Sequence, residues 1–128
     1  MVTAITNDIK IIVEVEFQQK QPNGLVHENI FAYRITIENN SEYTIKLLRR
    51  HWYINDSAHA KREVLGDGVV GLQPVIEPGN SHQYVSGCNI KSDIGKMYGY
   101  YIMEQLLDGK EFKVTIPSFN LIVPFVMN

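Results

Sequence analysis

The segment from Gly66 through Gly68 to Gly71 has the G-x-G-x-x-G spacing with which dinucleotide-binding domains hold pyrophosphate. Such a site needs a helix directly after the glycines, because the N-terminus of that helix binds the phosphates. Pro74 and Pro78 follow closely here, and proline disfavours the interior of a helix. We therefore expect an extended backbone after Gly71, with glycines that provide positive φ or close packing between strands.

A second way of binding an anion stays open for the same segment. Successive backbone N–H groups can hold an anion without a helix, so Gly66, Gly68 and Gly71 form a candidate ligand- or anion-binding loop. Asp67 inside the loop would repel a phosphate, whereas basic residues near it in the sequence would attract one. The sequence contains no Gly-Lys-Ser/Thr, which excludes a P-loop.

The histidines and the single cysteine do not form a recognisable metal-binding or catalytic set. His27, His51, His59 and His82 lack the close pairing that is typical of metal ligands. Cys88 and His82 on one strand would lie about 20 Å apart, too far for a nucleophile and its base. We therefore predict no metal site, no cofactor and no catalytic residue, in a protein that is not an enzyme.

Length and charge narrow the class of protein. A chain of 128 residues with 45% hydrophobic and 20% charged residues is typical of one folded domain, here 1–128. The formal net charge of -2 argues against binding to nucleic acid or to an anionic membrane. The N-terminal residues do not resemble a signal peptide, and the longest apolar runs are too short to span a bilayer. The expected location is the cytoplasm.

Most of the chain alternates apolar and polar residues with a period of two, which predicts half-buried strands. Turn signals such as Asn23-Gly24 and Asp108-Gly109 separate the alternating segments, and Pro117-Ser118 is interpreted as a further turn. The expected strands are 9–17, 31–38, 43–54, 61–65, 82–88, 97–103, 112–116 and 119–125. Short strands without a helical period predict an all-β sandwich or barrel of roughly seven to nine strands.

The aromatic residues suggest both a core and a surface. Trp52 is expected to anchor the core between two sheets, as a central tryptophan does in immunoglobulin-like sandwiches. Tyr98 and Tyr100 alternate on a later strand, and exposed tyrosines beside a glycine loop would suit a partner or small-ligand site. An ordinary structural strand face is the alternative. The candidate partner face comprises Arg49, Arg50, Trp52, Tyr98 and Tyr100.

Six spaced patterns follow one another along the chain. They are FAYxIxIxN from Phe31, LRxxWxIxD from Leu48, GxGVVGxQPxIxPG from Gly66, YxSG from Tyr84, GxMxGxYxM from Gly95 and IPxFxL from Ile116. With these patterns the chain closely resembles the ApaG family over nearly its whole length. The string GDGVVGLQP, followed by PG and YVSG, is the specific part of the resemblance.

The resemblance implies an antiparallel β-sandwich of the immunoglobulin-like or fibronectin type III-like kind, in a small cytoplasmic bacterial protein. It also implies a link with cobalt resistance and magnesium efflux without an assigned enzymatic reaction, and a related domain of eukaryotic F-box proteins implies an interaction role. We therefore predict a non-enzymatic interaction module associated with divalent-cation homeostasis, with protein partners, as a monomer or homodimer. The alternative function is a sensor that binds a phosphorylated ligand or small anion at the glycine loop 66–71.

Overall fold

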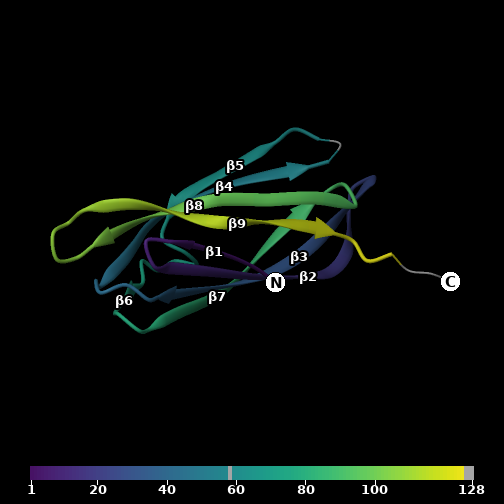
Figure 1. Cartoon of the computed structure of the whole chain (residues 1–128). Helices are drawn as coiled ribbons and strands as arrows, with labels where there is room; N and C mark the ends of the chain where they lie inside the picture. The colour runs from purple at the N-terminus through teal and green to yellow at the C-terminus, as the bar shows by residue number, and fades with distance from the viewer. Residues whose placement is uncertain (58, 126–128) are drawn as a thin grey trace.

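Two antiparallel sheets packed face to face form the protein in a computed structural model that describes residues 1–57 and 59–125 (Figure 1). The four-stranded sheet has the order β1-β2-β3-β7, and the five-stranded sheet has the order β5-β4-β8-β9 with β6 paired to one end of β4. The described residues contain nine strands and no helix, so the predicted all-β sandwich is confirmed. The strands are β1 (Val2–Thr6), β2 (Ile9–Asn23), β3 (Val26–Asn39), β4 (Ile45–Asp56), β5 (Arg62–Asp67), β6 (Val75–Ile76), β7 (Ser81–Ile90), β8 (Ile94–Gln105) and β9 (Glu111–Ile122).

The core lies between the two sheets and consists of the apolar residues that recur with a period of two. Strands of this composition are stable because every second side chain leaves water as the sheets pack. Trp52 is only 2% exposed, and its ring centroid lies 5.5 Å from that of Tyr33 and 5.9 Å from that of Phe119, which confirms its predicted role as a core anchor. Other fully buried residues include Ile9, Ile11, Val13, Ile35, Ile37, Leu47, Tyr101, Met103, Val114 and Leu121.

Two β-bulges in the five-stranded sheet change the expected alternation of inward and outward side chains. The register of β4 against β8 shifts between Leu47 and Arg49, and the register of β8 against β9 shifts between Met97 and Gly99. The predicted turn at Pro117-Ser118 is wrong, because β9 runs unbroken from Glu111 to Ile122. Proline is tolerated in a strand at such a bulge, where a ladder hydrogen bond is already missing.

One edge of the sandwich and one end of it are closed by specific contacts. The sequence did not suggest β1, which packs along β9 at one edge (Figure 1).

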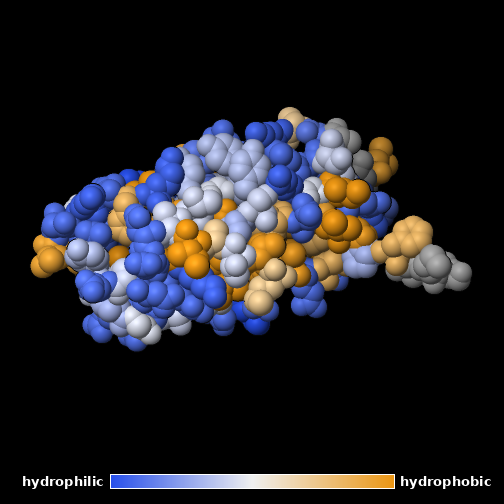
Figure 2. All heavy atoms as spheres, in the orientation of Figure 1, coloured by the Kyte–Doolittle hydropathy of each residue, from blue (hydrophilic) through white to orange (hydrophobic). Residues whose placement is uncertain are grey.

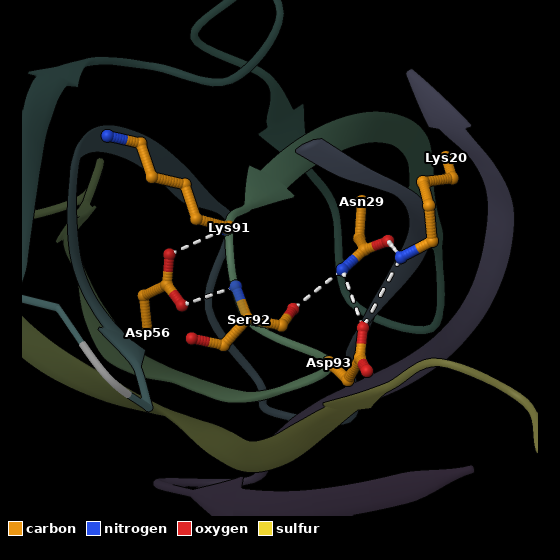
Figure 3. A network of polar contacts seen from close by, with 6 residues as sticks. All are labelled: Lys20, Asn29, Asp56, Lys91, Ser92 and Asp93. Atoms are coloured by element: carbon orange, nitrogen blue, oxygen red, sulfur yellow. Dashed lines mark hydrogen bonds and ion pairs between the residues drawn. The ribbon is translucent and has the colours of Figure 1, made fainter. Parts of the chain in front are cut away.

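At one end of the sandwich, the buried Asp56 carboxylate accepts hydrogen bonds from the backbone N–H groups of Lys91 at 2.6 Å and Ser92 at 2.9 Å (Figure 3). Burial alone would raise the pKa of Asp56, but hydrogen bonds from the Ser92 side chain and these N–H groups outweigh it and lower the pKa.

Asn29 fixes the same end from the four-stranded sheet. Its side-chain amide donates to the Ser92 carbonyl oxygen at 2.7 Å, and its Oδ1 accepts from Lys20 Nζ at 2.8 Å (Figure 3). Because buried polar groups are costly unless they are hydrogen-bonded, these contacts give the loop between β7 and β8 a defined position against β3 and β4.

Candidate functional site

The glycine segment is a tight turn between extended segments. Val69 and Leu72 exchange two backbone hydrogen bonds of 2.7 and 3.0 Å around the residues Val70 and Gly71. Both of these residues have positive φ, +46° and +76°, as a two-residue type I′ hairpin requires. No helix follows in the described part of the chain, so the expected extended backbone after Gly71 is confirmed. A helix dipole is therefore not available to a phosphate at this segment.

Gly68 is required by the backbone rather than by a ligand. Its φ is +60°, and a Cβ atom added there would lie 2.0 Å from the carbonyl oxygen of Leu72. Its N–H group donates to the Leu48 carbonyl oxygen at 2.8 Å. The N–H groups of Gly68, Val69 and Leu72 all donate to carbonyl oxygens of the chain, so these three groups are not free to bind a ligand.

Arg50 faces the carbonyl side of the same segment. Its Nη1 donates to the carbonyl oxygens of Asp67 and Gly68, both at 2.9 Å. A Cβ atom on Gly66 would lie 2.7 Å from the Arg50 guanidinium, so the absence of a side chain at Gly66 makes room for it. The segment therefore turns oxygen atoms toward a cation of its own chain. This arrangement differs from an anion-binding nest, which turns N–H groups toward its ligand.

The side chain of Arg50 lies on the inner face of the five-stranded sheet. Arg50 pairs with the fully buried Tyr101 across β4 and β8, and cross-strand partners share one face. The Tyr101 hydroxyl is hydrogen-bonded to that of Tyr84, and burial raises the pKa of both phenols well above the ordinary value. These tyrosines are therefore neutral next to Arg50.

The register corrects the candidate partner face. Trp52 is a core residue and Arg50 lies on the same inner face of β4, so neither stands among the ring residues of the outer face, although Arg50 reaches the rim of the hollow described below. Arg49, Tyr98 and Tyr100 do lie on the outer face, where Arg49 forms an ion pair with Glu111 at 2.7 Å. The bulge at Leu48 is the physical cause, because it puts Arg50 and Leu47 on one face of β4.

The outer face carries a contiguous group of four rings from two cross-strand pairs of β4 and β8, here called the aromatic row: Tyr98, Tyr53, His51 and Tyr100. Their successive ring centroids are 5.1, 4.6 and 4.9 Å apart, with interplanar angles of 17°, 26° and 34°. The Tyr100 hydroxyl and His51 Nδ1 are hydrogen-bonded at 3.0 Å, and His51 Nε2 lies 3.3 Å from Glu63 Oε2. All four residues are partly exposed.

Gly99 allows this row to form. A Cβ atom at Gly99 would lie 2.0 Å from the carbonyl oxygen of His51, so any larger residue would push β8 away from β4. Tyr98 and Tyr100, on either side of Gly99, are therefore brought against Tyr53 and His51. The glycine that matters for this surface lies outside the G-x-G-x-x-G segment.

Three lysines, here called the lysine set, lie over the aromatic row. Lys61 Nζ is 5.5 Å from the ring centroid of Tyr98 and 5.7 Å from that of Tyr53. Lys96 Nζ is 5.9 Å from the Tyr98 centroid, and Lys113 Nζ is 4.1 Å from the Tyr100 centroid. A hydrogen bond to Tyr98 raises the pKa of Lys61, so its ammonium group is charged at neutral pH. Cations at these distances are attracted to ring faces.

A hollow of about 380 Å³ opens beside the Tyr100 end of the row. Leu65, which is 63% exposed, and Ile102 are its apolar lining residues, and the charged residues Arg49, Arg50 and Asp67 also line it. The outer face thus combines rings, ammonium groups and a partly apolar hollow.

A second apolar area lies near the C-terminal end of β9. Ile94 and Ile122 are cross-strand partners there, and both are more than half exposed, as is Phe125. Apolar residues also gather toward this end on the face that Figure 2 shows. In the part of the chain that the structure describes, the lysines that lie over rings are all at the aromatic row, so the aromatic row is the better candidate site.

Sequence reasoning did not identify His51, Tyr53 and the lysine set. One local signal could have found the first two: if Trp52 faces the core, its neighbours on the strand must face outward. The lysines come from three separate segments: strand register places Lys96 and Lys113, and Lys61 directly precedes β5.

Comparisons with known proteins agree with the fold. A family model described as the ApaG domain matches residues 18–105. Proteins named Protein ApaG from Brucella abortus (strain S19) and Sinorhizobium fredii (strain NBRC 101917 / NGR234) are 42% and 40% identical over 124 residues. Both alignments cover 97% of this chain and 95% of the relative.

Two solved structures are also similar. The X-ray structure of the structural-genomics target SoR45 has a TM-score of 0.89 and 37% identity, covering 97% of this chain and 93% of that chain. The crystal structure of an ApaA protein from Bordetella pertussis has a TM-score of 0.84 and 34% identity, covering 93% of this chain and 96% of that chain. The similarity therefore extends to β1 and β9, both of which lie outside the segment 18–105.

Proposed function

The chain belongs to the ApaG family, and from that premise we propose that it is a non-enzymatic interaction module. Its partner face is the outer face of the five-stranded sheet. The observation that carries the proposal is the aromatic row with the lysine set above it. Tyrosine is enriched at protein interfaces because it offers a large contact area and a hydroxyl group at little cost in side-chain entropy.

The row is also well positioned for binding. Its rings stand on two central, hydrogen-bonded strands and are held by one another, so little ordering remains when a partner binds. The outer face of the four-stranded sheet differs, since it carries Glu14, Arg34 and Thr36 beside the exposed Val85, and none of the ring pairs of the described residues lies there.

We propose further that the module acts in the cytoplasm and influences divalent-cation homeostasis through its partner. The support is the link of the family with cobalt resistance and magnesium efflux, which the sequence resemblance implies. Among residues 1–57 and 59–125, no group of three or more His, Cys, Asp or Glu side chains could hold a metal ion. The same part of the chain contains no helix that is long and apolar enough to cross a membrane.

A melting experiment tests the indirect role. Excess Co²⁺ or Mg²⁺ should leave the melting temperature unchanged, because a ligand raises it only by binding the folded state. A rise that grows with metal concentration would show direct binding and would contradict the indirect role.

The interaction role is tested by affinity capture from extracts of cells that make the chain naturally. A specific partner should be captured by the unmodified protein and lost with Tyr98→Ala or Tyr100→Ala. Tyr43→Ala is the matched control, because Tyr43 is exposed but lies in the loop before β4, away from the row. If no partner exceeds background, or if the Tyr43 variant loses it equally, the proposal fails.

The alternative, a sensor of a phosphorylated ligand at Gly66, Gly68 and Gly71, stays a prediction. It has less support, because the N–H group of Gly68 and the guanidinium of Arg50 already contact carbonyl oxygens of the chain. Calorimetry with pyrophosphate is the direct measurement. Binding heat that decreases with added salt would favour the sensor over the interaction module.

A further inference from the structure

We propose that the partner of this face is an acidic peptide segment that carries an apolar side chain, with its carboxylates over the lysine set and its apolar side chain in the hollow beside Tyr100. This inference rests on the proposed function, because it names the partner of the same face.

The charges of the face favour carboxylates. Glu111 forms an ion pair with Arg49, and Glu63 lies at ion-pair distance from His51. None of the described carboxylates lies within ion-pair distance of Lys61, Lys96 or Lys113, whose ammonium groups lie over rings instead. A cation–π contact at an exposed site is weak and leaves N–H donors of the ammonium group free. Each lysine can therefore donate to a carboxylate while its ammonium group stays over the ring.

The positions of the lysines suit an extended segment. Lys61 and Lys96 lie at the Tyr98 end of the row, and Lys113 lies at the Tyr100 end. Tyr98 and Tyr100 are two residues apart on β8, so an extended peptide of roughly three residues passes from one end of the row to the other. Its acidic side chains would meet ammonium groups at both ends, and a leucine or phenylalanine near one end would reach Leu65 and Ile102 in the hollow.

The rings are poorly placed for a nucleic acid. A base needs a free ring face for stacking, but the ring of Tyr53 lies between those of His51 and Tyr98, and Lys113 covers Tyr100. The face also includes Glu63 and Glu111, and the whole chain has a net charge of -2. Both facts weaken attraction to a phosphate backbone. An acidic peptide meets the lysines without needing the ring faces.

The experiment is an NMR titration of the full chain with the blocked peptide EDELFED. Signals of the aromatic row and of Leu65 should shift, and binding should weaken with added salt. The uncharged peptide QNQLFQN should bind about ten-fold more weakly, and the peptide EDESSED should bind more weakly as well. Equal binding of QNQLFQN, no shift with EDELFED at millimolar concentration, or shifts of the same signals with a single-stranded RNA oligomer alone would each overturn the inference.

A charge-reversal variant separates this inference from the proposed function. Lys61→Glu combined with Lys96→Glu and Lys113→Glu should abolish EDELFED binding. The matched control reverses three lysines elsewhere, Lys10, Lys91 and Lys110, and should bind within about two-fold of the unmodified protein, because the net charge changes equally. If a captured partner is lost with Tyr98→Ala but kept by the reversal of the lysine set, the interaction module stands and the acidic partner is wrong.

Discussion

The glycine segment and the aromatic row lie close together on the five-stranded sheet, but their polar groups have different partners. In the glycine segment, the Gly68 N–H group donates to a backbone carbonyl oxygen of β4, and the carbonyl oxygens of Asp67 and Gly68 accept hydrogen bonds from Arg50. Over the aromatic row, charged ammonium groups lie on rings at the surface, and none of the carboxylates that the structure describes is within ion-pair distance of them. Groups whose partners are already supplied by the chain maintain the fold, whereas unmatched charges on a rigid surface are available to another molecule.

The largest expected effect is at Gly68. Gly68→Ala should lower the free energy of unfolding by about 3 kcal/mol, because it adds a contact of 2.0 Å with the Leu72 carbonyl oxygen to the strain of positive φ. Gly79→Ala is the control, since Gly79 has a φ of +82° but no atom within 4 Å of an added Cβ. It should cost about 1 kcal/mol. Thermal melting followed by circular dichroism measures both, and equal losses would show that close packing at Gly68 is unimportant.

A double-mutant cycle tests the fit between Gly66 and Arg50. Arg50→Ala should cost about 2 kcal/mol, because it leaves the carbonyl oxygens of Asp67 and Gly68 without their donor. Gly66→Ala should destabilise the unmodified protein through its 2.7 Å approach to the guanidinium, and should cost much less in the Arg50→Ala background. Unfolding in urea gives the coupling. Additive losses would mean that Gly66 does not serve to accommodate Arg50.

A smaller effect of opposite sign is expected at Val70. This β-branched residue has a φ of +46°, which glycine adopts at little cost, so Val70→Gly should raise the unfolding free energy by about 0.5–1 kcal/mol. Val85→Gly, at an exposed position within β7, should lower it, because glycine weakens a strand. Thermal melting of the two variants should therefore shift in opposite directions, and a loss of stability in both would contradict the prediction.

The smallest effect on stability is expected in the aromatic row. Tyr98→Ala and Tyr100→Ala should each change the unfolding free energy by less than about 1 kcal/mol, because both side chains stay partly exposed in the folded protein. Trp52→Ala should cost about 3–5 kcal/mol as a core truncation. If urea unfolding gave the tyrosine variants losses as large as that of Trp52→Ala, the row would be part of the core and the comparison would fail.

The sequence was sufficient for the all-β fold, for the core role of Trp52 and for the absence of a helix after Gly71 in the described chain. These features depend on local signals: alternation with a period of two, and prolines near a turn. The short β1 has too few residues to establish an alternating pattern, and Pro117 in β9 looks like a turn residue because the bulge that accommodates it depends on β8.

The outer face was only partly predictable, because a bulge has no clear local signature in one sequence. The prediction groups Arg50 with Arg49, but neighbouring residues of a strand point to opposite faces, and the bulge at Leu48 decides which of the two points outward. The lysine set forms because the pairing of β4, β8 and β9 brings Lys96 and Lys113 to the aromatic row, and because Lys61 lies directly before β5. No window of a single strand contains that information.

The single tryptophan of the chain lies between the sheets, whereas the rings on the outer face belong to tyrosine and histidine. Emission from Trp52 therefore reports whether the interior is dry and intact, and it should stay constant while a ligand occupies the surface. A tryptophan built into an added peptide would then supply its own separate optical signal. Folding and docking could be followed in the same cuvette without attaching a dye.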